Sequence, residues 1–131
     1  MVDRLHNKVT YGPFGLYMIP RDLAKIGQLM LQNGVWKGQQ IVSSEWIAAS
    51  TVKQVEMHET DTKDFEYGYY WWIIPEIKAF TTWGHGGNYI TIIPDKNLVV
   101  VLTRFPNSGN AVGIHLTEFV PILKTLINGS S

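Results

Sequence analysis

Helical spacing of apolar residues marks the first clear element of the chain. The residues that share one face are Leu23, Ile26, Gly27 and Met30. Pro20 suits the first position of a helix, and Gly34 stands where a helix would end. The pattern predicts a helix over residues 20–32, with its apolar face packed against another element.

The same spacing returns near the C-terminus. The apolar residues there are Leu116, Phe119, Val120, Leu123 and Ile127. They predict a final helix in which Pro121 either introduces a kink or lies in the first turn. Between the two helices, residues 36–40 predict a small turn or hairpin. Ser43 or Ser44 then predicts the N-cap of a short helix.

Four runs rich in β-branched and aromatic residues predict strands. They cover residues 67–74, 78–83, 89–93 and 98–104. Pro94 and Asn97 favour a hairpin turn between the last two runs. The polar stretch 53–66 predicts an exposed loop. The whole chain, residues 1–131, therefore predicts one α+β domain, an antiparallel sheet with flanking helices.

Composition supports a globular protein and excludes several classes of function. Hydrophobic residues make up 45% of the 131 residues and charged residues 17%. Eleven basic and eleven acidic residues cancel, so no nucleic acid partner is expected. The longest apolar runs fall short of the roughly 18 residues that a membrane span needs.

No metal or other cofactor is expected from the sequence. The chain has no cysteine, which excludes disulfides and thiolate ligands. His6, His58 and His115 occur singly, without the spacing of metal ligands, and we expect solvated or hydrogen-bonded positions for them.

A glycine-rich segment between two β-branched runs is the main candidate site. Its residues are Trp83, Gly84, His85, Gly86, Gly87 and Asn88. Glycine within a strand marks a bulge or a place where a ligand or another backbone comes close. The segment therefore predicts a strand that something approaches closely.

Three short patterns of active-site serine enzymes also occur. Ser50 and Lys53 spell S-x-x-K, Ser108 and Asn110 spell S-x-N, and residues 85–87 resemble K-T-G. The S-x-N pattern follows the histidine-glycine element, which reverses the usual order. Ser50 also ends a short helix at a polar loop, a poor setting for a nucleophile. We therefore expect no nucleophile at Ser50 and turn-forming roles for Ser108 and Asn110.

Three blocks in order carry a resemblance to a known family. They are GLYMIPRDLAKIGQLMLQNGVWKGQQIVSSEWI, YGYYWW and WGHGGNYITIIPDKNLVVVLT. Over residues 11–105 the chain resembles the C-terminal part of the serine β-lactamase-like hydrolases. This family holds class C β-lactamases, esterases, D-Ala-D-Ala peptidases related to penicillin-binding proteins, and 6-aminohexanoate-dimer hydrolases. The W-G-x-G-G pattern is most similar to the esterase and amide-hydrolase branch.

The resemblance implies a role for the glycine-rich strand. In the family, the K-T-G strand forms one wall of the active site, and a backbone N–H on it supplies half of the oxyanion hole. The implied partner is an acyl substrate, an ester, amide or β-lactam. Two registers stay open: residues 85–87 replace K-T-G, or Trp83 and Gly84 do so and His85 donates its N–H. The His85 side chain either contacts the substrate or caps a turn.

The resemblance also implies what this chain lacks. The family's S-x-x-K helix and Y-x-N loop precede the helix at residues 20–32. We therefore expect the C-terminal part of a larger hydrolase, with a partial β-lactamase/transpeptidase-like fold and no activity alone. The alternatives are a non-catalytic module that recruits a peptide or partner at the open strand, and a structural fragment without a function of its own.

Location and association are implied in the same way. The family suggests a periplasmic or extracellular site of action. Removing the helical domain that covers the sheet in the family would expose apolar positions, for which Trp71, Trp72, Ile90 and Ile92 are the candidates. Exposed apolar surface and bare strand edges favour association, so a homo-oligomer is expected.

Overall fold

The fold is built on one antiparallel sheet in which the strands follow chain order. The structure is a computed structural model that describes residues 17–58, 60–104 and 113–129. Five strands pair in the order β3-β4-β5-β6-β7. Their bounds are β3 (Glu66–Tyr67), β4 (Trp72–Ile74), β5 (Ala79–Thr81), β6 (Tyr89–Ile93) and β7 (Leu98–Leu102). The predicted α+β class is confirmed.

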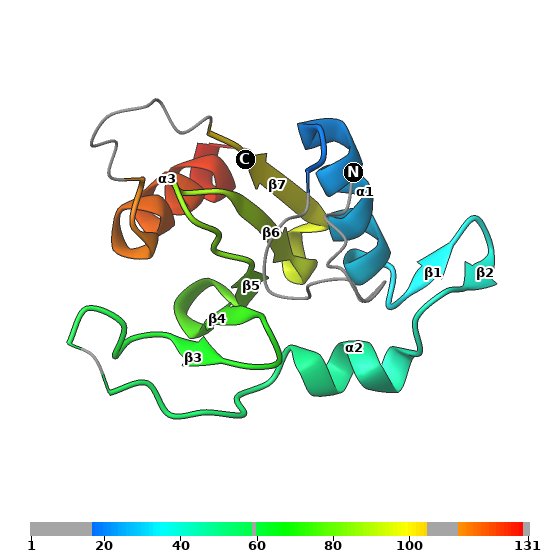
Figure 1. Cartoon of the computed structure of the whole chain (residues 1–131), viewed down its shortest axis with the longest axis horizontal. Coiled ribbons are helices and arrows are strands. Elements are labelled where there is room, and N and C mark those ends of the chain that lie inside the picture. Colours follow the sequence, from blue (N-terminus) through cyan, green and yellow to red (C-terminus); the bar gives the residue numbers. More distant parts are fainter. Residues whose placement is uncertain (1–16, 59, 105–112, 130–131) are drawn as a thin grey trace, which may run out of the picture.

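Two helices cover opposite faces of this sheet (Figure 1). On one face, α1 (Pro20–Leu31) packs against β6 and β7. On the other face, α3 (Leu116–Gly129) supplies buried side chains to the cluster that contains Tyr89 and Ile93. The strand residues alternate between the two apolar clusters, as the period of two in a strand requires.

The expectation that Ile90 and Ile92 lie on an uncovered face of the sheet is wrong. Both point toward α1, where their exposed fractions are 7% and 0%. Gly27 lets the helix come close, because a Cβ built there would lie 2.4 Å from Val99 Cγ1. Trp71 and Trp72 are half-buried. Helix α1, which lies within this chain, therefore covers the face that was expected to be bare.

The short elements after α1 agree with the sequence. Strands β1 (Val35–Trp36) and β2 (Gln39–Gln40) form the predicted hairpin. Helix α2 (Ser44–Ser50) has Ser43 as its N-cap, and the Ser43 hydroxyl accepts a hydrogen bond from Trp46 N at 3.2 Å.

The single strand predicted over residues 67–74 is two strands. The chain turns back at Tyr69 and Tyr70, and Gly68 N donates to Trp71 O at 2.8 Å across the turn. Tyr70 has a left-handed φ of 65°, which is rare for a bulky residue. The loop prediction for 53–66 holds for most of that stretch, but Phe65 is buried.

Two turns of similar form join the later strands. The 3-10 turns η1 (Pro75–Ile77) and η2 (Pro94–Lys96) each end at a residue with a φ of 49°, Lys78 and Asn97. Pro121 lies inside α3, past its first turn, so the first-turn alternative is wrong. Within the described ranges, no helix is long and apolar enough to cross a membrane.

Candidate functional site

The candidate segment begins where β5 runs on beyond its last paired residue. Thr82 N donates to Ile90 O at 3.0 Å, and Ile90 N donates to Thr82 Oγ1 at 2.9 Å. Further along, Gly84 N donates to Asn88 O at 2.8 Å. The residues that follow β5 and those that precede β6 therefore stay paired. The candidate segment is the connection between these two strands.

A tight turn closes this connection. Gly87 N donates to Gly84 O at 3.1 Å, which defines a four-residue turn. Gly86, at its third position, has the positive φ of 80° that a type II turn requires there. Asn88 Nδ2 donates to His85 O at 2.8 Å, and Asn88 Oδ1 accepts from Arg104 N at 2.9 Å. The asparagine side chain therefore ties the turn to the chain beyond β7.

The backbone that approaches these glycines belongs to this chain. A Cβ on Gly87 would lie 2.7 Å from Ile114 N, and a Cβ on Gly113 would lie 2.2 Å from the carbonyl carbon of Gly86. A Cβ on Gly86 would meet only the Asn88 side chain, at 3.9 Å. The predicted close approach therefore has an internal partner at Gly87, while no described residue fills the space beside Gly86.

The main-chain donors of the segment fall into two groups. The N–H groups of Gly84, Gly87 and Asn88 are bonded within the turn. The N–H groups of Trp83, His85 and Gly86 have no acceptor among the described residues. Strand β4 pairs with β5 no further than the Trp72–Thr81 pair, so β4 does not satisfy these donors.

Trp83 is held by neighbours on both sides. Its ring meets Trp72 edge to face at a centroid distance of 5.4 Å, and His115 at 4.5 Å with an interplanar angle of 87°. Such contacts add about 0.5–1.5 kcal/mol for an aromatic pair. The sequence did not predict His115 near this segment, because no motif or regular spacing links it to the glycine-rich residues.

The side chain of His85 is exposed. It makes no hydrogen bond or ion pair to the part of the chain that the structure describes, and only its carbonyl oxygen is used, by Asn88. The side chain is therefore available to an outside group, and no contact assigns it a role in the fold.

Ser50 and Lys53 are not brought together. Ser50 is buried, with 2% of its surface exposed, and its Oγ donates to Ile47 O at 3.1 Å. Lys53 Nζ instead pairs with Glu56 Oε1 at 2.7 Å. This hydrogen bond raises the pKa of Lys53 above its ordinary value, which keeps the amine protonated and so unable to accept a proton from a serine.

The remaining sequence candidates add no second centre. His58 is exposed, while His115 is engaged through both ring nitrogens, by Asp61 and Thr117. His6, Ser108 and Asn110 lie outside the described residues. Among the residues described, no group of three or more His, Cys, Asp or Glu side chains could hold a metal.

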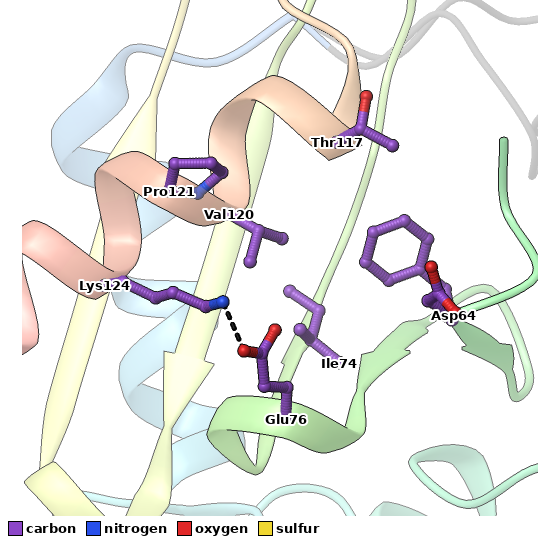
Figure 2. Close-up of a pocket in the computed structure, with 8 residues that line it drawn as sticks. Asp64, Ile74, Glu76, Thr117, Val120, Pro121 and Lys124 are labelled. Carbon is purple, nitrogen blue, oxygen red and sulfur yellow. Dashed lines mark hydrogen bonds and ion pairs between the residues drawn. The ribbon is translucent and has the colours of Figure 1, made fainter.

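A separate cavity of about 450 Å³ lies between α3 and the β4–η1 region (Figure 2). An ion pair between Lys124 and Glu76 spans one side of it, and Ile74 and Val120 form its apolar floor. No residue of the glycine-rich segment lines this cavity. Thr117 is part of the lining, and its hydroxyl lies 2.8 Å from His115 Nδ1, a contact at the start of α3. We assign this cavity no chemistry.

Comparison with known proteins bears on this geometry. No family model matches the sequence, and no curated protein matches it. Among solved structures, the chain is similar to one named "Putative 6-aminohexanoate-dimer hydrolase from Bacillus anthracis". The sequence identity is 27% and the TM-score is 0.59, over 83% of this chain and 29% of that protein. This chain therefore spans less than a third of the length of the Bacillus anthracis protein. The likeness supports a β-lactamase-like serine hydrolase fold.

Proposed function

We propose that this chain is the C-terminal part of a β-lactamase-like serine hydrolase and forms the substrate-side wall of its active site. One observation carries the proposal. Main-chain N–H groups without an acceptor among the described residues lie at the end of β5, beside Gly86, where a Cβ would meet none of these residues closer than 3.9 Å, within a fold similar to a hydrolase. A main-chain donor without a partner is what an oxyanion hole requires.

His85 is the donor that we favour. Of the two registers that the sequence allows, one has Trp83 and Gly84 replace K-T-G, which leaves the donation to His85. The N–H of His85 is unbonded among the described residues, whereas those of Gly87 and Asn88 already close the turn. A donor drawn from the later part of the turn would therefore have to break it first.

The proposed chemistry is acyl transfer. A serine from another segment gives its proton to a base of that segment and adds to the acyl carbon of an ester, amide or β-lactam, and the carbonyl oxygen becomes an oxyanion. When the carbonyl re-forms, the C–O or C–N bond breaks and the leaving alcohol or amine takes up the proton. The His85 N–H and the serine's own N–H would each donate to that oxygen, at about 2.7–3.1 Å. The acyl group would lie along residues 83–86. Because Ser50 and Lys53 are held apart, the part of the chain that the structure describes would supply one of the two donors, the N–H of His85.

A chimaera tests the proposal. This chain replaces the matched region of the Bacillus anthracis protein, and the hydrolysis of p-nitrophenyl acetate is measured for the chimaera, the unaltered protein and this chain alone. We expect turnover by the first two and none by the chain. Circular dichroism and a fluorophosphonate probe establish the folding of the chimaera and the identity of its nucleophile. A folded chimaera without turnover beside an active parent, or labelling of Ser50 in the chain alone, contradicts the proposal.

A non-catalytic binding module is the second candidate. The same unbonded N–H groups of Trp83, His85 and Gly86 would serve an extended peptide as well as an acyl oxygen. In that case the chain alone should bind peptides, with amide shifts confined to these residues, and the folded chimaera should be inactive. The two experiments together separate the candidates.

A further inference from the structure

Three consecutive residues, Gly113, Ile114 and His115, lie against the back of the glycine turn. Gly113 approaches the Gly86–Gly87 backbone so closely that a Cβ would overlap it. Ile114 O accepts a hydrogen bond from Tyr89 Oη at 2.6 Å. The His115 ring meets the Trp83 ring in an edge-to-face contact. The segment from 113 to 115 therefore contacts the turn at its start, its middle and its end.

His115 is fixed in turn by the first residues of α3. Its carbonyl oxygen accepts from Glu118 N and Phe119 N, both at 3.0 Å, and its own N–H donates to Glu118 Oε2 at 3.0 Å. The bond from His115 N–H to the Glu118 carboxylate is the glutamate half of a capping box, with histidine in the N-cap position. Helix α3, which is anchored in the core, therefore sets the place of His115.

The ring of His115 is held through both nitrogens. Nδ1 lies 3.3 Å from Thr117 N and 2.8 Å from Thr117 Oγ1, and Nε2 lies 3.3 Å from Asp61 Oδ2. An Nδ1 that accepts from the Thr117 N–H leaves the ring proton on Nε2, the nitrogen that faces the Asp61 carboxylate. Asp61, in the loop at residues 60–65, thus contacts the ring at Nε2, whereas Thr117 of α3 contacts it at Nδ1.

We propose that His115 and Asp61 are positioning residues for the main-chain donor at His85. Asp61 orients the imidazole, the imidazole holds the Trp83 indole through the edge-to-face contact, and Trp83 leads directly into Gly84 and His85. The role of the His85 N–H as an oxyanion donor rests on the proposed function. The positioning itself is measurable in this chain without any hydrolysis, so the two can fail separately.

Amide hydrogen exchange in the 15N-labelled chain tests the positioning. The reporters are the Gly87 and Asn88 amides, because their bonds to Gly84 O close the turn. Asp61→Ala should speed their exchange roughly fivefold, the factor that a typical net hydrogen bond corresponds to. Asp61→Asn keeps an acceptor and should restore the rates. The Asp61 side chain is 59% exposed, so the fold should tolerate both changes.

Two controls separate positioning from general loosening. Glu56→Ala removes another exposed ion pair, with Lys53, and should leave the turn amides unchanged. The Ile90 and Ile92 amides report the sheet and should keep their protection in every variant. In the wild-type chain, the ring current of Trp83 should shift the His115 ring protons, and Trp83→Leu should abolish this shift.

Three results would overturn the inference. Turn amides in Asp61→Ala that exchange within twofold of the wild-type rates would show that Asp61 does not act on the turn. Equal acceleration at Ile90 and Ile92 would show general loosening. A failure of Asp61→Asn to restore the rates would exclude the polar contact between residue 61 and His115 as the cause.

Discussion

Alanine substitutions at neighbouring glycines separate backbone strain from steric contact in the turn. Gly86 and Gly87 have almost the same φ, 80° and 83°, so alanine meets the same left-handed penalty at both, about 1–2 kcal/mol. Their surroundings differ. The new Cβ would have open space at Gly86, but at Gly87 it would lie 2.7 Å from Ile114 N and 3.2 Å from Ile114 O.

The expected losses of stability follow from this difference. Gly86→Ala should reduce the free energy of unfolding by about 1–2 kcal/mol. Gly87→Ala should reduce it by about 2–5 kcal/mol, because overpacking against fixed backbone adds about 1–3 kcal/mol. Gly38→Ala is the matched control, with a φ of 80° and no atom within 4 Å of the Cβ.

Urea unfolding followed by tryptophan fluorescence gives these free energies. Equal losses for Gly86→Ala and Gly87→Ala would refute the internal contact at Ile114. They would also support the simpler interpretation that every glycine in the segment is there only to leave space for the substrate. Any catalytic test by substitution at Gly87 must therefore be separated from its effect on folding.

Three further predictions test the core, the buried phenol and association. Ile92→Ala should cost about 2–5 kcal/mol of stability in urea, since Ile92 is fully buried, whereas Ile122→Ala, at a residue 46% exposed, should change it by under about 0.5 kcal/mol. Burial raises the pKa of Tyr89, so the unfolded chain loses this proton first and stability should fall as pH rises above about 10. Tyr89→Phe should flatten that fall in urea titrations between pH 9 and 11, and an unchanged slope would contradict the assignment. Sedimentation equilibrium should show a dimer or larger species, because Trp46 and Tyr70 are 54% and 71% exposed, and a 14.9 kDa monomer would contradict this.

Local patterns predicted most elements because local physics decides them. The period of apolar residues and the terminal proline placed α1 within one residue of its end, and β6 agrees with the predicted strand at both ends. The strand over 67–74 was wrong because the tight turn at Tyr69 and Tyr70 uses a left-handed tyrosine instead of a glycine. Sequence patterns carry no signal for such a strained residue.

Packing between segments that are distant along the chain could not be predicted from the sequence patterns. Ile90 and Ile92 seemed uncovered only because the family comparison assigned their cover to a missing domain, whereas Gly27 brings α1 onto them. The contacts of Gly113 with Gly86, and of His115 with Trp83, join residues about 30 positions apart. The glycine pattern predicted that something approaches the strand, but not that part of the approach comes from the same chain.

A main-chain donor at His85 is tested most directly by a pair of substitutions at this residue, made in the active chimaera. His85→Ala removes the side chain and keeps the main-chain N–H, whereas His85→Pro removes both. Proline suits the second position of the turn, and the lost N–H has no acceptor among the described residues, so the fold should tolerate it. If the His85 N–H is the donor, kcat for p-nitrophenyl acetate should fall about 10²–10³-fold in His85→Pro and stay near the value of the unsubstituted chimaera in His85→Ala. Equal kcat values in the two variants, whether both high or both low, would contradict a main-chain donor at His85.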